Sequence, residues 1–375
     1  MKAGHGRLAF AHQLRGIAVL LVVISHYLQL FWERPEVVDR HIGLRLEAGA
    51  PPALVAWLAD AGIATGSIGV AIFFLISGLV IPISITRLRR RFLLARLLRI
   101  YPTYLAALAV NLVVYCASHA GAAMPWPGPL VLASNLLLLN PYLRIASLDM
   151  VNWTLAIEMT FYCLAALGWR WVERYGRRAI VATGAAVLAA ALLLRIGMPD
   201  GGRGMAMAVV GEFVNEAMFV SFILLGTLCY LHLEGRLTTR ALLLGLAFGY
   251  LGFCAIWLVL VRSHEIWRVP MNYLLALLIF TGSYFFRHRF RGGAWLARLA
   301  DISYPLYLVH ALLGYCVIRL LMAQGQPYSL AVLVATCAAL GLAAVLHQRV
   351  ERPSLHYVAR CCQIVRPAQE KMRRS

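Results

Sequence analysis

The stretch LRGIAVLLVVISHY at residues 14–27 decides the fold, because apolar side chains run almost unbroken between Arg15 and His26. Together with the residues that follow, it predicts a helix over 15–31, which is long enough to enter and cross a hydrocarbon core of about 30 Å. No small-residue cleavage pattern follows this run, so we expect a retained helix and not a signal peptide. Similar apolar runs recur along the whole chain.

The composition of the chain agrees with this stretch. Of the 375 residues, 61% are hydrophobic and only 14% are charged, and the mean hydropathy is +0.75. A soluble domain could not bury so much apolar surface. The eight cysteines show no metal-ligand spacing, so we expect small core residues and no metal site. The chain is therefore predicted to be an integral membrane protein with lipid as its main surroundings.

Ten helices are predicted from apolar windows bounded by charges, Gly and Pro. They cover residues 15–31, 66–85, 100–118, 151–171, 178–196, 212–232, 241–261, 272–286, 302–322 and 328–348. The segment 129–140 is apolar but too short for a full span, so we expect a re-entrant or interfacial piece there.

The distribution of charge gives these helices a direction. A formal net charge of +19 would suggest nucleic acid on a compact soluble domain. Here most of the 35 lysines and arginines fall in alternate loops between spans. Because Lys and Arg collect in cytoplasmic loops, the sequence predicts an all-α bundle of about ten transmembrane helices with both termini cytoplasmic, and no nucleic-acid partner. Residues 1–355 form the predicted transmembrane domain, and residues 356–375 form a basic cytoplasmic tail.

Three ionisable residues are predicted to lie deep in the bilayer. From the helical rise, His26 lies about 16 Å from Arg15, Glu158 about 10 Å from the outer end of its helix and His310 about 12 Å from the inner end of its own. A charge at such depth costs several kcal/mol and needs a partner or a task. The three residues could provide a base and an orienting carboxylate, or each could be satisfied by a neighbouring helix.

Two further pairs of charged residues leave alternatives open. Arg96 and Arg99 share one helical face in the densest basic loop, residues 87–99, where they could bind phosphates or could only mark the cytoplasmic side. Glu212 and Glu216 lie one turn apart near the predicted outer end of their helix. They could line a vestibule for a polar acceptor, or they could be solvated at headgroup level.

Six short motifs occur in order along the chain. They are Arg15 and His26 with ten residues between them, FFLISG at 73–78, Arg96-x-x-Arg99, WTLAIEMTFY at 153–162, ISYPLYLVH at 302–310 and ERP at 351–353. In these motifs, and over nearly its whole length, the chain resembles the acyltransferase 3 family of membrane O-acyltransferases. Gln13 and Asp301 depart from the family pattern beside two of the motifs, without removing a catalytic group.

The resemblance implies a reaction and a location. The reaction is transfer of an acyl group, commonly acetyl, from cytoplasmic acyl-CoA to a hydroxyl of a carbohydrate-containing acceptor, such as a surface polysaccharide, lipopolysaccharide or glycolipid, at the far side of the membrane. The implied location is a bacterial inner membrane, with acyl-CoA as co-substrate and no permanently bound cofactor. Many relatives add an extracytoplasmic esterase-like domain. Because this chain ends shortly after the tenth helix, we expect the membrane core to act alone or with a partner.

The residues and the resemblance together predict a catalytic group of His26, Glu158 and Arg15. Arg96 and Arg99, helped by Arg15, would hold the phosphates of acyl-CoA. His26 would act as general base on the acceptor hydroxyl or would carry the acyl group transiently, and Glu158 would orient His26 or bind the acceptor.

Other residues and other functions remain open from the sequence. Residues that could contact the acceptor or be structural are Trp153, Ser77, Tyr304 and His310, and Ser77 could also carry the acyl group. A secondary transporter could use His26, Glu158 and His310 to relay protons or bind a polar solute. A non-catalytic subunit of a polysaccharide assembly complex is a third reading. The sequence gives no oligomeric state.

Overall fold

The computed structural model describes residues 2–43, 49–119, 126–197, 205–261, 266–290 and 293–362. Every regular element in these ranges is a helix, and no strand occurs among them. The prediction of an all-α fold is therefore confirmed.

Ten of the described helices have 18 residues or more, and each predicted helical range falls on one of them. They are α1 (Lys2–Ile24), α5 (Thr65–Leu88), α6 (Phe92–Ser118), α8 (Asn152–Tyr175), α9 (Arg177–Gly197), α10 (Met205–Leu233), α11 (Thr239–Leu260), α12 (Arg268–Phe285), α14 (Ser303–Ala323) and α15 (Tyr328–Leu346). The shorter helices are η1 (Ser25–Leu30), α2 (Phe31–Glu33), α3 (Pro35–Ile42), α4 (Ala53–Asp60), η2 (Arg89–Arg91), α7 (Pro129–Leu136), η3 (Arg287–Arg289), α13 (Ala294–Asp301), η4 (His347–Glu351) and α16 (Arg352–Cys362).

Seven helical stretches of the described residues are long and apolar enough to cross a membrane. They are Leu8–Glu33, Thr65–Ser118, Arg177–Gly197, Met205–Leu233, Thr239–Leu260, Ser303–Ala323 and Tyr328–Cys361. One of these stretches joins α5 and α6, which were predicted as separate spans. Helices α8 and α12 are not among the seven, because polar residues such as Glu158 and Asn272 interrupt their apolar sequence. The chain is thus an integral membrane protein with seven candidate spans against the ten predicted.

Helix α1 does not stop at Ile24 but continues through η1 and α2 as far as Glu33. The segment η1 is a π-helix, in which the backbone bonds reach one residue further than in an α-helix. Such bulges occur frequently at functional sites, and this one carries His26. The apolar periodicity of the sequence gives no signal for it.

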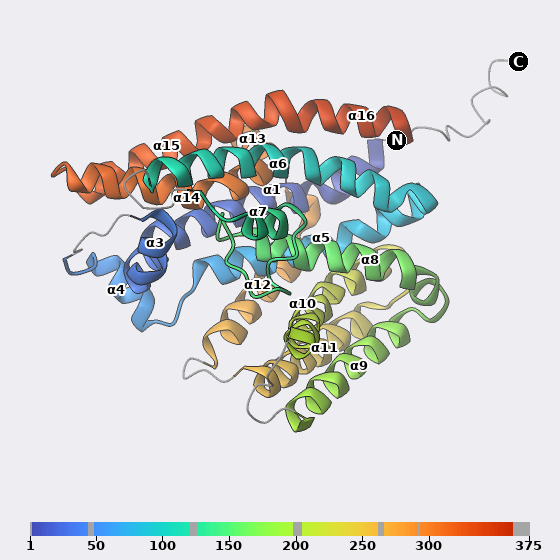
Figure 1. Cartoon of the computed structure of the whole chain (residues 1–375). Coiled ribbons are helices and arrows are strands. Elements are labelled where there is room, and N and C mark those ends of the chain that lie inside the picture. The colour runs from blue at the N-terminus through green and yellow to red at the C-terminus, as the bar shows by residue number, and fades with distance from the viewer. Residues whose placement is uncertain are drawn as a thin grey trace, which may run out of the picture.

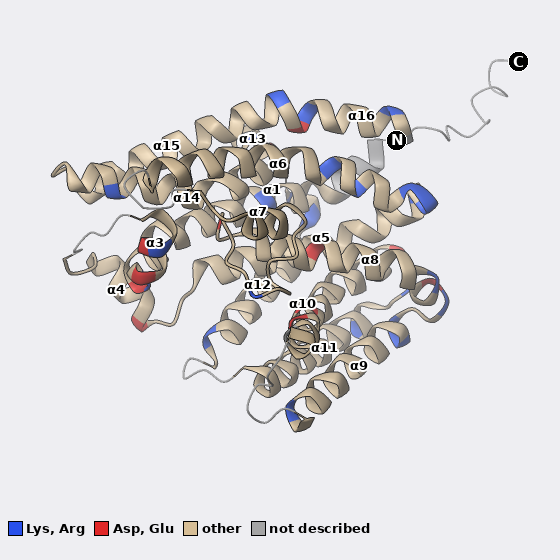
Figure 2. Ribbon diagram, viewed as in Figure 1, with Lys and Arg blue, Asp and Glu red and all other residues tan. Residues whose placement is uncertain are grey.

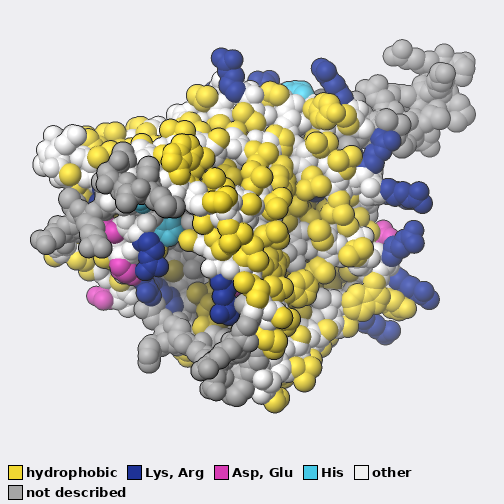
Figure 3. Space-filling view, viewed as in Figure 1, with side chains coloured by type: hydrophobic (Ala, Val, Ile, Leu, Met, Phe, Trp, Pro, Cys, Tyr) yellow, Lys and Arg dark blue, Asp and Glu magenta, His cyan; other side chains and the backbone are white. Residues whose placement is uncertain are grey.

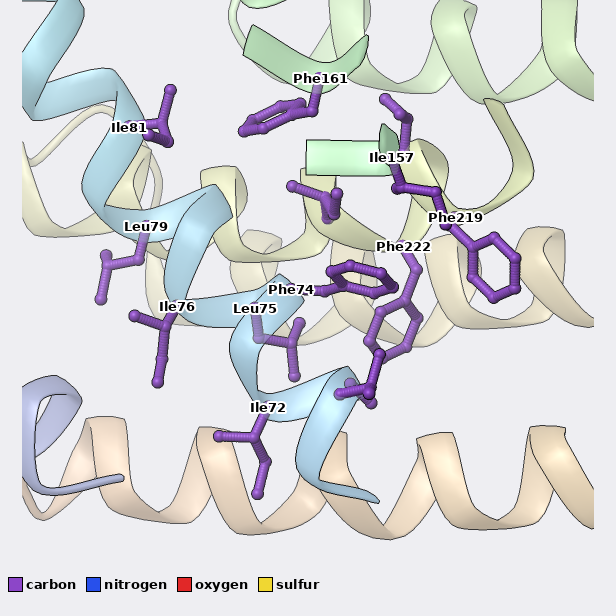
Figure 4. Close-up of a cluster of buried hydrophobic side chains, with 14 of the residues drawn as sticks. Ile72, Phe74, Leu75, Ile76, Leu79, Ile81, Ile157, Phe161, Phe219 and Phe222 are labelled. Carbon is purple, nitrogen blue, oxygen red and sulfur yellow. The ribbon is translucent and has the colours of Figure 1, made fainter. Parts of the chain in front are cut away.

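Helix α5 lies at the centre of the bundle and packs against α1, α8, α10 and α12 (Figure 1). Helices α6, α14 and α15 lie above it in that view, and α9, α10 and α11 lie below. The space between α5, α8 and α10 is filled by buried hydrophobic side chains (Figure 4). Phe74 of α5 lies 5.9 Å, centroid to centroid, from the ring of Phe219 of α10.

On the face seen in Figure 3, hydrophobic side chains cover the middle, and many of the basic side chains gather at one edge. Figure 3 shows a broad apolar face with Lys and Arg along its right side. In Figure 2 this basic edge is where α5 turns into α6 and where α8 turns into α9. The start of α1 and the end of α16 lie on the same side (Figure 1). A lipid-facing belt with one basic rim is the surface expected of a membrane bundle.

Two predicted boundaries can be compared with the helices. The helix in segment 129–140 is α7, whose 8 residues reach only about 12 Å. The prediction that this segment does not span the bilayer is therefore confirmed. The predicted start of the tail at residue 356 falls inside α16, and residues 363–375 lie outside the described residues.

Two glycines allow α5 and α10 to approach each other closely. A methyl group on Gly78 would overlap the carbonyl oxygen of Ile223, and a methyl group on Gly226 would overlap that of Leu75. Thr227 of α10 also donates a hydrogen bond of 3.1 Å to the Gly78 carbonyl. Small residues that let helix backbones meet are typical of packing in membranes.

We expect Gly78→Val to destabilise the bundle, because the branched side chain must push α5 away from α10. Overpacking at such a site should lower the free energy of unfolding by about 2 kcal/mol or more. Thermal unfolding of the detergent-purified chain measures this as a lower midpoint. Gly252→Ala is the matched control, since nothing lies within 4 Å of an added methyl there. Equal midpoints for Gly78→Val and the control would contradict the close crossing.

Candidate functional site

Two cavities of similar size lie inside the bundle. The first, here called the basic cavity, has a volume of about 300 Å³ and is lined by residues that include Arg15, Ser77, Arg96, Arg99, Glu158 and Tyr162. The second, here called the aromatic cavity, has a volume of about 310 Å³ and is lined by residues that include Ser25, His26, Trp153, Phe219, Trp257 and Tyr273. Only Val70 and Tyr307 line both. The predicted site residues are thus divided between two chambers that meet at one wall.

The basic cavity brings together guanidinium groups from two helices. Arg15 comes from α1, and Arg96 and Arg99 come from α6. The guanidinium of Arg96 lies 5.6 Å from the ring centroid of Phe92 and 5.5 Å from that of Tyr162, so it is held by aromatic faces. Arg96 is buried and also donates a hydrogen bond to Ser84. Three arginines that share one cavity with a single carboxylate make it suited to an anion.

Glu158 of α8 lies in the basic cavity. Its Oε1 accepts hydrogen bonds from the hydroxyl groups of Ser77, at 3.0 Å, and of Tyr162. It shares this cavity with Arg15 and Arg96. The sequence predicted that Glu158 would lie beside His26. The structure instead places Glu158 in the basic cavity and His26 in the aromatic cavity. Both residues have a similar predicted depth along their helices. The face of α8 that carries Glu158, however, lines the basic cavity and not the aromatic cavity.

His26 lies at the wall of the aromatic cavity, where the π-helix η1 presents it. Its Nδ1 is 2.7 Å from the hydroxyl oxygen of Tyr315. Its ring centroid is 4.7 Å from that of His310, and the two rings are almost perpendicular at 89°. Two of the three deep ionisable residues predicted to converge are therefore neighbours.

His310 is fully buried on α14 and lines neither cavity. Its Nδ1 lies 3.1 Å from the carbonyl oxygen of Leu306 and 2.9 Å from that of Tyr307. Because carbonyl oxygens only accept, this nitrogen carries the proton and donates to them. The Tyr27 hydroxyl donates to the His310 carbonyl at 2.8 Å. These bonds fix His310 as a rigid neighbour of His26.

Tyr315 is a functional candidate that sequence reasoning missed. It lies on α14 five residues beyond His310, is fully buried, and has its hydroxyl against His26 Nδ1. It belongs to none of the six motifs, and an aromatic residue in an apolar helix is usually core. Only the packing of α14 against α1 and η1 reveals the contact.

The first turn of α8 supplies residues to both cavities. Val151 and Trp153 line the aromatic cavity, and Thr154 lines the basic cavity. Asp149 holds this turn in place, since its Oδ1 accepts hydrogen bonds from the Val151 and Asn152 amides at 3.1 and 3.0 Å. Burial raises the pKa of the Asp149 carboxyl, and these hydrogen bonds oppose the rise.

Glu216 is not solvated at headgroup level, so that alternative from the sequence is wrong for this residue. Helix α10 begins at Met205, so Glu216 lies about 16 Å from its start. The residue is fully buried, and its Oε2 accepts hydrogen bonds of 2.5 Å from the Tyr142 and Thr160 hydroxyl groups. It lines neither cavity, so it ties the segment before α8 to α10. Glu212, one turn earlier, is only half-buried.

The structure also locates Tyr304 and the two residues that depart from the family pattern, Asp301 and Gln13. Tyr304 lines the basic cavity and donates a hydrogen bond of 3.1 Å to the carbonyl of Ile100. Asp301, one of the two departures from the family pattern, lies 3.1 Å from the imidazole Nε2 of His12 at the same cavity. The other departure, Gln13, is buried. Among the described residues no cluster of His, Cys, Asp and Glu could hold a metal ion.

A comparison with protein families assigns the chain to a known family. A family model, Acyl_transf_3, described as an acyltransferase domain, matches residues 8–348. The chain belongs to this acyltransferase family. The match runs from α1 into η4 and so includes every helix that lines the two cavities of this membrane acyltransferase. No curated protein and no solved structure matched the chain.

Proposed function

We propose that this acyltransferase moves an acyl group, preferably acetyl, from acyl-CoA to a hydroxyl of a carbohydrate-containing acceptor. The observation that carries the proposal is the division of the site. Arginines suited to phosphates line one cavity, a histidine suited to base catalysis lines the other, and the two cavities share a wall. A donor and an acceptor that arrive from opposite sides need such an arrangement.

The proposed topology has ten helices crossing a bacterial inner membrane, with both termini in the cytoplasm. The basic edge of the bundle supports this orientation, because Lys and Arg prefer the cytoplasmic side (Figure 2). Arg89–Arg91 of η2 and Arg177 at the start of α9 belong to this edge. The basic cavity, which contains Arg99, would then face the cytoplasm, where acyl-CoA is found.

The donor is proposed to bind with its phosphates against Arg96 and Arg99, assisted by Arg15. Planar guanidinium groups bind phosphate oxygens in pairs. The lining of the same cavity also includes apolar side chains such as Val70 and Phe73, as a flexible pantetheine arm requires. Glu158 lines this cavity together with its hydrogen-bond partners Ser77 and Tyr162, so we assign Glu158 to the donor and not to the orientation of His26.

In the proposed reaction His26 acts as general base from the aromatic cavity. Its Nε2 takes the proton of the acceptor hydroxyl while the hydroxyl oxygen attacks the thioester carbonyl carbon. The carbon–sulfur bond breaks, CoA leaves as a thiolate, and the proton passes to that sulfur. Tyr315 would accept a hydrogen bond from Nδ1–H and so keep Nε2 free for the proton.

The acceptor is proposed to bind in the aromatic cavity. A sugar ring has an apolar face and a rim of hydroxyl groups. Trp153, Trp257 and Tyr273 offer flat aromatic faces, and Ser25 and Ser67 offer hydroxyl groups that donate and accept hydrogen bonds. The side chain of Trp153 is 40% exposed, so part of this wall is accessible from outside.

The transporter and the non-catalytic subunit fit these observations less well. A proton relay through His26, Glu158 and His310 needs adjacent groups, whereas Glu158 has its hydrogen bonds in the other cavity. A transporter would take up solute without acyl-CoA. A non-catalytic subunit would leave product acylation unchanged when His26 is replaced.

Replacing His26 with Ala should abolish acyl transfer, with a loss of at least about 100-fold, because the hydroxyl then has no base. Mass spectrometry of surface polysaccharide and glycolipid fractions from cells that carry the wild-type chain should find one acyl group that the His26→Ala cells lack. His288→Ala, an exposed histidine outside both cavities, is the matched control. Full acylation by His26→Ala at normal protein content would contradict the mechanism.

Replacing Tyr315 with Phe should lower kcat by about ten-fold and leave KM for acyl-CoA unchanged, because one hydrogen bond to His26 is lost and the donor cavity is intact. Initial rates at varied acyl-CoA concentration and pH measure this. A structural role alone would leave the pH profile of kcat unaltered, and that result would remove Tyr315 from the mechanism.

Replacing Arg99 with Ala should raise KM for acyl-CoA about ten-fold with a smaller effect on kcat, since a phosphate contact acts mainly in binding. Arg96→Ala should act in the same direction. Isothermal titration calorimetry with CoA compares the affinity of the wild-type and variant chains for the donor when no acceptor is present. Arg240→Ala, an exposed arginine of α11 outside both cavities, should leave affinity unchanged. Unchanged affinity in both cavity variants would place the donor elsewhere.

A further inference from the structure

Two side chains, Val70 of α5 and Tyr307 of α14, line both cavities and so form part of the wall between them. Every other residue that lines one cavity is absent from the other. Val70 is a short and rigid side chain on a packed helix. Tyr307 is long, ends in a polar group and is only partly buried, because it faces both cavities. It is therefore the part of the wall that can move.

Tyr307 is held by hydrogen bonds to the start of α8. Its hydroxyl donates a hydrogen bond of 2.6 Å to Oγ1 of Thr154, and its oxygen also lies 3.3 Å from the carbonyl oxygen of Val151. Thr154 itself donates to the same carbonyl at 3.0 Å. The ring also packs edge-on against Phe73, with the centroids 6.0 Å apart. One short hydrogen bond, one longer polar contact and two ring contacts, with Phe73 and with His310, hold the side chain in place.

We propose that Tyr307 determines the selectivity of the acyltransferase for an acceptor hydroxyl over water. The inference rests on the proposed function, in which acyl-CoA occupies the basic cavity and His26 serves the aromatic cavity. With Tyr307 across the wall, the thioester cannot meet His26. A water molecule in the aromatic cavity can therefore contact His26 but not the thioester carbonyl. This separation prevents hydrolysis of acyl-CoA, a side reaction that enzymes avoid by excluding water from the reacting groups.

The bonds of Tyr307 also connect its position to the acceptor. Val151 and Trp153 line the aromatic cavity, and both belong to the turn that holds the Tyr307 hydroxyl. A sugar packed on Trp153 presses on this turn, whereas a water molecule does not. The passage between the two cavities opens when the acceptor is in place. A conformational step that only the correct substrate drives is a common source of specificity.

Both competing reactions use the same chemistry at His26. With a sugar hydroxyl, the acyl thioester and the alcohol give an ester and the free CoA thiol. With water, they give a carboxylic acid and the free CoA thiol, and the proton travels through His26 to the sulfur in each case. Release of CoA in the absence of any acceptor therefore reports loss of selectivity.

The test uses the full chain, purified in nanodiscs, with acetyl-CoA as the only substrate and a thiol reagent to follow free CoA. Tyr307→Ala should join the cavities and raise acceptor-free CoA release about ten-fold over the wild type. Thr154→Val keeps the ring and removes one hydrogen bond, so it should raise release about three-fold. Tyr250→Phe, which loses a phenol bond to the Pro270 carbonyl outside both cavities, should leave release at the wild-type level.

His26→Ala in the Tyr307→Ala background should return CoA release to the wild-type level. The inference is overturned if neither Tyr307→Ala nor Thr154→Val raises release in wild-type-like folded protein that binds acetyl-CoA. It is also overturned if the rise persists without His26. If the wild-type chain fails to bind acetyl-CoA, the proposed function fails instead, and calorimetry on the same samples separates that outcome.

Discussion

The hydrocarbon core of a membrane offers no hydrogen-bond partner to a buried charge or to a free backbone amide. The protein must therefore satisfy these groups internally, and this constraint shapes the structure of the chain. Helices satisfy the backbone. Charges withdrawn from solvent near helix ends are paired, as between Arg319 and Asp39 at 2.8 Å and between Arg268 and Glu33 at 2.9 Å. Other polar groups line two cavities, among them Arg15, Glu158 and His26. A membrane protein of this size thus concentrates its chemistry where the packing leaves space for it.

The division of that space gives the acyltransferase its proposed working order. A cytoplasmic donor and an outer acceptor would approach one wall from two sides, so the protein need not move a large substrate across the bilayer. The same wall would have to keep water from the donor. Close packing of α5 against α10 at Gly78 keeps α5, which carries Val70, in a fixed place, while Tyr307 on α14 is held by hydrogen bonds at its hydroxyl and by ring contacts with Phe73 and His310. The two residues that line both cavities thus belong to different helices.

Much of the fold could be predicted from the sequence, because apolar runs and basic loops carry the information. The ten helical ranges, the short α7 and the all-α class follow from it. Arg15, Arg96 and Arg99 were also predicted to act together, and they do line one cavity.

The features of the site that could not be predicted depend on which faces neighbouring helices present to one another. Depth along each helix gave Glu158 and His26 a similar level, yet they line different cavities. The π-helix at His26, the Tyr315 contact and the burial of Glu216 arise from tertiary packing alone. The most direct test of the two-cavity account is cryo-electron microscopy of the full chain with CoA bound. The account expects the phosphates against Arg96 and Arg99 and the thiol end at Tyr307, and CoA bound outside the basic cavity would contradict it.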